Sequence, residues 1–583
     1  MSQKPTRGRH FFVPPKNKRK GQIIVLAAVL MVVMMGMVAF GVDTGYMYTM
    51  QTRLQSAVDS AALAGAATLG DGEDEARDIA LEFLVRNPIR PVDYDPMQND
   101  VSSQINQYSS EHGTNLEITL GYWDEATKTF SSSGGVIPPS SVSIKMTHRN
   151  LPLFFARALG QDEFEVTAEA IATYQPRDIM LVLDYSRSMN FDSLYNSPLG
   201  VSHVRDNLQE CWQDLGNPQY GNLPLEPEYI TTTLNTNDHD KPDTTTEYRF
   251  TSAHITCESD IQEAYIWFQG GGSQGVYTGN SRSLTVQGTG YNNGREISQI
   301  RITTRHPDYW WVPSHTHFYY RNYNDLKNHL GISHVSYPYP GGSWNEYIDY
   351  VRHQSTYNAQ YANDRYKFGH TNLLHYWIEW RSSHSDTPDL WKAGIQPVEA
   401  VKDSVDVFAE LIETAGTNDQ LGLSIYNSSS GNGLLEHALS KNYDQVRTTA
   451  RQRQANHHHS ATNIGAGLEN ALDEIEENGR AGSFKMVVLM TDGVPTWYNG
   501  SADEVGARNY LIQQAERARD MKIPVFAVSL GSGADTELME QVAAITAGYH
   551  FTVEGGQSPE EYTEDLKDAF REIANKRPLR LVQ

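Results

Sequence analysis

The segment Ile179-Met-Leu-Val-Leu183-Asp184-Tyr-Ser186-Arg-Ser188 contains five apolar residues that run directly into a polar turn. An uninterrupted apolar run is typical of a central strand in a parallel sheet that helices cover on both faces. Ligands of such sheets bind outside the carboxyl ends of the strands. The turn offers a carboxylate and two hydroxyls there, and hard cations prefer oxygen ligands. The segment predicts a buried strand with part of a metal site at its end, although polar turns often follow strands.

Two later stretches complete a pattern with this turn. Residues 484–490 form a second apolar run, which ends in Thr491-Asp492-Gly493. Between the two runs, Ala461-Thr462-Asn463 precedes an expected helix. The set resembles the von Willebrand factor type A family. Its metal-ion-dependent adhesion site combines an Asp-x-Ser-x-Ser turn, a Thr in a later loop and a Thr-Asp-Gly turn.

The resemblance implies a role for each matching residue. Ser186 and Ser188 would bind Mg²⁺, Mn²⁺ or Ca²⁺ directly, and Thr462 would bind directly or through water. Asp184 and Asp492 would hold the bound waters. In the family an acidic group of a protein partner fills the open coordination position, so the resemblance implies a partner with an exposed Asp or Glu.

The sequence departs from the family pattern before Thr462. A glycine-rich loop is usual there, but this chain has the three histidines His457, His458 and His459. We expect them at the rim of the site, where protonation near pH 6.5 would weaken cation binding. The alternative is a solvated polar loop with no role.

The rest of the predicted domain alternates strands with helices. Residues 398–412 have the apolar spacing of an amphipathic helix, and residues 421–426 and 523–529 are further apolar strands. This alternation predicts an α/β fold with a doubly wound, mainly parallel sheet. Residues 177–190 and 393–583 are expected to form it.

About 200 residues separate the two parts of this domain, a second departure from the family. Residues 191–392 hold 19 of the 32 tyrosines and 8 of the 10 tryptophans. We expect a mainly β inserted domain, in which the aromatic residues form either the core or a carbohydrate- or protein-binding face. Because the insertion follows Ser188, it should stand beside or over the metal site.

The chain has two cysteines, Cys211 and Cys257, and both fall in the insertion. Outside the cytoplasm they could form a disulfide. Two buried free thiols are the alternative.

The N-terminal region predicts a membrane anchor. Residues 1–22 contain seven Lys or Arg and no acidic residue. The next twenty residues, from Ile23 to Val42, carry no charge and are long enough to cross a bilayer as a helix. The basic cluster places the N-terminus in the cytoplasm and the bulk of the chain in the periplasm or outside the cell. The net charge of −24 argues against nucleic acid as a partner.

A second resemblance begins at this anchor. Lys20-Gly-Gln22, Asp43-Thr-Gly-Tyr46 and the small-residue run from Leu54 to Gly65 are similar to the N-terminus of TadE/TadG-like Flp pilus-assembly proteins. An alanine-rich helix continuing from the membrane would look much the same. Residues 43–176 are expected to form a small α+β stalk module.

These features together predict a membrane-anchored, metal-dependent binding or adhesion protein without enzymatic activity. By resemblance, its setting would be a Tad/Flp-type pilus or secretion apparatus. Two alternatives are a polysaccharide-acting hydrolase or carbohydrate-binding activity in the insertion, and a structural assembly factor with a vestigial metal site.

Overall fold

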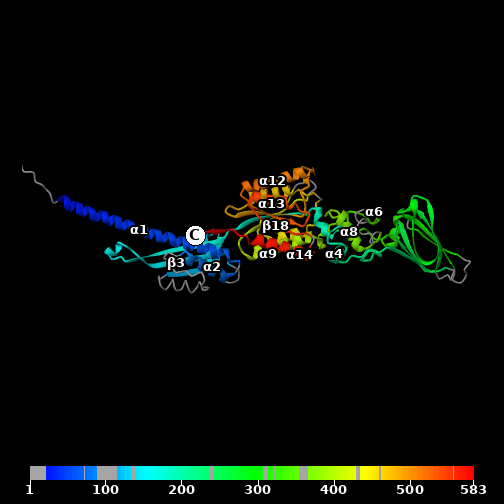
Figure 1. Cartoon of the computed structure of the whole chain (residues 1–583), viewed down its shortest axis with the longest axis horizontal. Helices are drawn as coiled ribbons and strands as arrows, with labels where there is room; N and C mark the ends of the chain where they lie inside the picture. Colours follow the sequence, from blue (N-terminus) through cyan, green and yellow to red (C-terminus); the bar gives the residue numbers. More distant parts are fainter. Residues whose placement is uncertain are drawn as a thin grey trace, which may run out of the picture. The chain divides into compact units, whose positions relative to one another are not determined.

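The computed structural model of the chain comprises two compact units (Figure 1). The first contains Met1–Gln175 and Arg577–Gln583, and the second contains Pro176–Lys576. The structure describes residues 22–70, 72–87, 114–124, 127–132, 139–235, 241–305, 313–319, 322–353, 366–427, 433–458, 461–555 and 557–582. The predicted basic tail therefore lies almost entirely outside the described residues.

The first unit packs a long helix, α1 (Gln22–Ala67), against a five-stranded antiparallel sheet. The second half of α1 presents small residues such as Ala57, Ala61 and Ala62 to the sheet, and all three are buried. Their size lets the helix and strands approach closely. The other elements are α2 (Glu73–Arg86), β1 (Thr114–Asp124), β2 (Thr129–Ser132), β3 (Ser141–Pro152), β4 (Glu163–Tyr174) and β19 (Leu579–Leu581).

The first half of α1 extends beyond this sheet (Figure 1). Its apolar side chains between Ile23 and Val42 are exposed. Within the described residues, α1 alone is long and apolar enough to cross a membrane. The predicted span and the small-residue run after it are thus one uninterrupted helix.

The second unit is built on a six-stranded sheet in the order β13-β12-β5-β14-β17-β18. All neighbouring strands pair in parallel except β13, which is antiparallel to β12. The predicted mainly parallel sheet is confirmed. Its strands are β5 (Arg177–Leu183), β12 (Gln420–Ile425), β13 (Leu434–Ser440), β14 (Phe484–Thr491), β17 (Val525–Leu530) and β18 (His550–Val553).

Alternation along β5 explains why helices cover both faces of this sheet. Met180 and Val182 pack into one buried cluster, and Ile179, Leu181 and Leu183 pack into another. The first cluster includes α11 (Ile464–Asn478), α12 (Glu504–Asp520) and α13 (Thr536–Thr546). The second includes α9 (Val398–Thr414), α10 (Tyr443–Arg451) and α14 (Pro559–Asn575). Figure 1 shows α12 and α13 on one side of the sheet, and α9 and α14 on the other.

The insertion contains a second sheet and several helices. Strands β6 (Ile230–Leu234), β7 (Thr244–Tyr248), β8 (Ser252–Phe268), β9 (Ser273–Gln287), β10 (Ile297–Arg305) and β11 (Pro313–Tyr319) form it by antiparallel pairing. The helices are α4 (Val201–Asp214), α5 (Tyr323–His329), α6 (Trp344–His353) and α8 (His370–Trp380). Figure 1 shows α4, α6 and α8 between the two sheets.

Much of the aromatic content of the insertion is core. Trp212 and Trp377 are fully buried and stack with their ring centroids 5.7 Å apart. Trp344 is also buried, and its Nε1 donates to the carbonyl oxygen of Val335. These three tryptophans are therefore unavailable for stacking on a carbohydrate.

The candidate disulfide is not formed. Cys211 on α4 and Cys257 on β8 are both free thiols, and both are buried. The nearest polar partner of the Cys257 sulfur is the Thr244 hydroxyl, 3.6 Å away on the neighbouring strand. The two cysteines instead act as small apolar core residues.

A buried ion pair joins the beginning of β5 to the rest of the second unit. The Arg177 guanidinium binds the Asp419 carboxylate, with Nη2–Oδ2 at 2.8 Å and Nε–Oδ2 at 3.0 Å. Its Nη1 donates to the carbonyl oxygens of Ala574 and Lys576, at 2.9 and 3.3 Å, at the C-terminal end of α14. Arg177 therefore ties the first strand of the unit to its last helix.

The chain then returns to the first unit, which the sequence did not predict. The C-terminal strand β19 pairs with β4, with Leu579 opposite Tyr174. The second unit is thus inserted between two neighbouring strands of the first.

Replacing Asp419 by Asn should strongly destabilise the second unit, because it leaves the buried Arg177 charge without a counter-ion. Loss of one partner of a buried pair costs about 3–5 kcal/mol in the free energy of unfolding. Urea unfolding monitored by tryptophan fluorescence measures this, since nine of the ten tryptophans lie in the second unit. The matched control is Arg517→Ala, which removes exposed pairs to Asp473 and Glu476 and should cost at most about 1 kcal/mol. Equal effects of both variants would contradict the assigned role of Arg177.

Candidate metal centre

The turn after β5 is ordered by its own side chains. The Asp184 Oδ1 atom accepts a hydrogen bond from the Ser186 backbone N–H at 2.8 Å. The hydroxyls of Ser186 and Ser188 lie 2.8 Å apart. Three of the predicted site residues therefore already converge within the turn.

The neighbouring strand β14 brings the Thr-Asp-Gly turn to the same place. The Ser188 hydroxyl donates to Asp492 Oδ1 at 2.7 Å, and the Thr491 hydroxyl donates to Asp184 Oδ2 at 2.9 Å. The parallel register of β5 and β14 aligns the ends of the two strands and so accounts for this meeting. Residues some 300 positions apart thus form one hydrogen-bonded cluster.

Thr462 lies on the loop before α11, where it lines a cavity together with residues of the two turns. This cavity has a volume of about 470 Å³, and Ser188, Thr462 and Asp492 all line it. The Thr462 carbonyl accepts from the backbone N–H groups of Thr496 and Trp497, at 2.9 and 3.2 Å. Those bonds fix the loop against the segment that follows Asp492.

Two carboxylates are buried side by side in this cluster. Asp184 is fully buried and Asp492 is 9% exposed. Burial and the neighbouring Asp184 charge raise the pKa of Asp492 well above its usual range. A pair of buried like charges is unfavourable unless a proton or a cation neutralises it.

The donor set fits a hard divalent cation. Five oxygen-bearing side chains form two runs with contacts of 2.7 to 2.9 Å, one from Ser186 through Ser188 to Asp492 and the other from Thr491 to Asp184. Adjacent ligands of an octahedral Mg²⁺ at its usual bond length lie about 2.9 Å apart. In the described part of the chain, no group of three or more His, Cys, Asp or Glu residues could hold a metal.

Other residues support the two turns, and the sequence did not single them out. The Tyr185 carbonyl accepts from the Asn427 side chain and from the Asn456 backbone, both at 2.7 Å. The Tyr426 hydroxyl donates to the Met490 carbonyl at 2.7 Å. Tyr426 and Asn427 directly follow β12. The signal in the sequence that could have identified them is therefore a pair of polar residues at the end of a third strand of the sheet.

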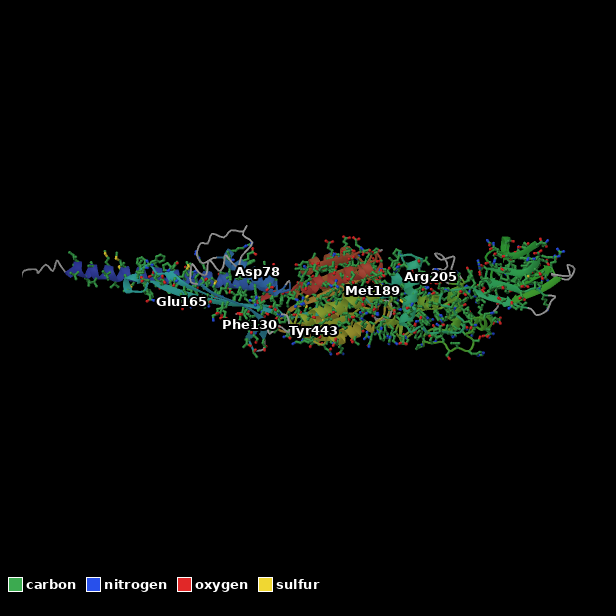
Figure 2. The ribbon with its side chains drawn as sticks, turned by 90° about the horizontal axis from the view of Figure 1, so that it is seen from below. Asp78, Phe130, Glu165, Met189, Arg205 and Tyr443 are labelled. Atoms are coloured by element: carbon green, nitrogen blue, oxygen red, sulfur yellow. The ribbon has the colours of Figure 1, made fainter. Side chains whose placement is uncertain are left out.

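The insertion contributes to the cavity wall. Phe191, Asp192 and Pro198 line it, together with Glu554 and Tyr562 from the other side. In Figure 2, Met189 lies between Tyr443 of α10 and Arg205 of α4, where the chain passes into the insertion. The insertion therefore stands beside the candidate site, as its connection after Ser188 required.

The described histidines before Thr462 face other groups. His457 is buried and stacks on His384 with ring centroids 4.4 Å apart, and His458 Nε2 lies 3.2 Å from Glu436 Oε1. Neither histidine lines the cavity, and His459 lies outside the described residues. Burial, together with the nearby positive charge of Arg453, lowers the pKa of His457 to about 3. Protonation of His457 near pH 6.5, as hypothesised from the sequence, is not expected.

Three protein-family models match the chain. The Flp pilus-assembly TadE/G-like model matches residues 21–68, and the Tad-like Flp pilus-assembly model matches residues 64–172. The von Willebrand factor type A domain model matches residues 391–565. This last match begins after the insertion, and the pairing of β5 between β12 and β14 adds the Asp-Tyr-Ser-Arg-Ser turn to the domain.

Several solved structures can be aligned with about 30% of this chain. The pilus adhesin SpaC from Lactobacillus rhamnosus GG is 18% identical over 30% of this chain and 28% of its own, with a TM-score of 0.25. A von Willebrand factor type A protein from Catenulispora acidiphila is 12% identical over 30% and 37%, with a TM-score of 0.24. The SpRpn10 VWA domain is 13% identical over 30% and 82%, with a TM-score of 0.23. A search of curated proteins found no match.

The lowered pKa of His457 predicts how the stability of the fold changes with pH. The unfolded chain takes up a proton at this histidine near pH 6.5, whereas the folded chain does so only near pH 3. The free energy of unfolding should therefore fall as the pH drops below 6.5. In His457→Gln this fall between pH 6.5 and 5 should be shallower than in the wild type, as measured by urea unfolding at each pH. An unchanged slope would show that His457 titrates normally in the folded protein.

Proposed function

We propose that this chain, which carries a TadE/G-like Flp pilus-assembly region, a Tad-like region and a von Willebrand factor type A domain, is a membrane-anchored, metal-dependent protein-binding or adhesion protein. Its helix α1 would anchor it in the inner membrane by residues 23–42, with the N-terminus in the cytoplasm. Both units would then lie in the periplasm or outside the cell. The setting would be assembly of a Tad/Flp-type pilus, or surface attachment.

The observation that carries this proposal is the cluster of Asp184, Ser188 and Asp492 beside Thr462. These residues come from three segments that are distant in sequence. Ser188, Thr462 and Asp492 line one cavity, and Asp184 accepts a hydrogen bond from Thr491, the residue before Asp492. A fold that needed these residues only for stability would have no reason to bury two adjacent carboxylates. Binding of Mg²⁺, Mn²⁺ or Ca²⁺ would account for that burial, because the cation neutralises the two carboxylates.

The chemistry of the site suggests the kind of partner. A divalent cation held by two hydroxyls and balanced by two carboxylates retains affinity for another oxygen ligand. The cavity is open enough to admit a side chain beside Thr462 and Ser188. An Asp or Glu of a protein partner would supply the ligand. Without the cation, Asp192 and Glu554 on the cavity wall would repel that carboxylate.

Isothermal titration of the full chain with Mn²⁺ and Mg²⁺ tests the proposal. The wild type should bind one cation per chain. Ser188→Ala and Thr462→Ala should weaken binding at least about tenfold, because each removes an oxygen at the site. The matched control is Ser532→Ala, which removes another hydroxyl from the same cavity wall and should leave the affinity unchanged.

Unfolding temperatures of all variants without cation must stay near that of the wild type, so that lost binding reflects a lost ligand. If the folded wild type binds no cation, alone or with an acidic peptide present, a structural role with a vestigial site replaces this proposal. Equal loss in Ser532→Ala would place the cation elsewhere in the cavity.

A further inference from the structure

The turn between β3 and β4, residues 153–162, exposes large apolar side chains. Phe154 is 55% exposed, Phe155 is 48% exposed, and Leu159 is 90% exposed. They lie on or next to a short 3₁₀ helix, η1 (Ala156–Leu159). Soluble surfaces rarely gather such residues at one loop, and a cluster of this kind marks a contact with a partner or a membrane.

This turn is fastened to α1 at a defined height. The Asp43 carboxylate accepts hydrogen bonds from the backbone N–H groups of Phe154, Phe155 and Ala156, at 2.9, 3.0 and 2.7 Å. The Tyr46 ring packs edge-on against Phe154 with centroids 5.0 Å apart. Asp43 is the first residue after the expected span, so these contacts hold the turn level with the end of that span.

The apolar surface of the turn is continuous with that of the helix. A cavity of about 970 Å³ lies between them, lined by Leu30, Met34 and Phe40 of α1 and by Phe155, Ala158 and Leu159 of the turn. Figure 1 shows β3 beside α1, and Figure 2 shows the labelled Glu165 of β4 beside the same helix. The turn thus lies along α1 on the side of Asp43 that leads into the expected span.

We propose that the β3–β4 turn is a second membrane-contacting element, which enters the leaflet facing the two units, with phospholipid acyl chains filling the cavity beside α1. This rests on the proposed membrane anchor. Burying the exposed Phe155 and Leu159 side chains in lipid is favourable, because it removes apolar surface from water. Arg157 is exposed on the same short helix, where its Nε lies 3.9 Å from Asp162 Oδ1, and a long basic side chain of this kind can bury its stem while its charge stays at the head groups.

Fluorescence quenching of the full chain in phosphatidylcholine vesicles tests this proposal. Leu159→Cys is labelled with an environment-sensitive dye, and the buried Cys211 and Cys257 stay unlabelled in the folded protein. Leu30→Cys, in the expected span, calibrates lipid contact. Val505→Cys, an exposed apolar position on α12, is the matched control. The quencher is a mixture of phosphatidylcholines that carry a spin label on the acyl chain, either close to the head group or near the middle of the chain, so that both depths are covered.

We expect these lipids to quench the label at 159, and to leave the label at 505 unchanged. Quenching at 30 without quenching at 159 overturns the proposal, because the anchor is then inserted while the turn stays in water. A label at 159 that is shielded from water but not quenched also overturns it, since protein, such as a second copy of the chain, then covers the turn. Absence of quenching at 30 instead refutes the membrane anchor itself.

Discussion

The parallel pairing of β5 between β12 and β14 is the constraint on which the rest of the second unit depends. The three strands run in the same direction, so the residues that follow the last hydrogen-bonded pair of each strand meet at one edge of the sheet. Asp184 and Asp492 become neighbours for this reason, and Tyr426 and Asn427 lie close enough to support them. Because the strand ends are set by the sheet, a long insertion can leave directly after Ser188 without disturbing the cluster.

The strands and the candidate ligands could be predicted because their signals are local. An apolar run followed by Asp184-Tyr-Ser186 predicts both a strand and a polar turn within a few residues, and the run before Asp492 does the same. The family matches and the sheet confirm this part of the prediction at the level of the fold. That these residues bind a cation stays a prediction until binding is measured.

Other features depend on contacts between distant residues, which local patterns do not contain. Nothing near Leu579 shows that it pairs with Tyr174, roughly 400 residues earlier. The role of the aromatic residues in the insertion stayed open for a related reason. The sequence allowed either a core or a binding face, and the structure packs Trp212 and Trp377 against each other in the core. The spacing of Cys211 and Cys257 likewise carried no information on where their side chains would lie.

The insertion of the second unit between β4 and β19 has a mechanical consequence. If the second unit is pulled while α1 is held in place, tension passes through two covalent links, at residues 175–176 and 576–577. Arg177 joins both links inside the second unit, because it holds the carbonyls of Ala574 and Lys576. The backbone bonds between β4 and β19 share the tension in the first unit. A unit attached at both of its ends in this way shares the tension between two covalent connections, whereas a unit at the end of a chain has only one.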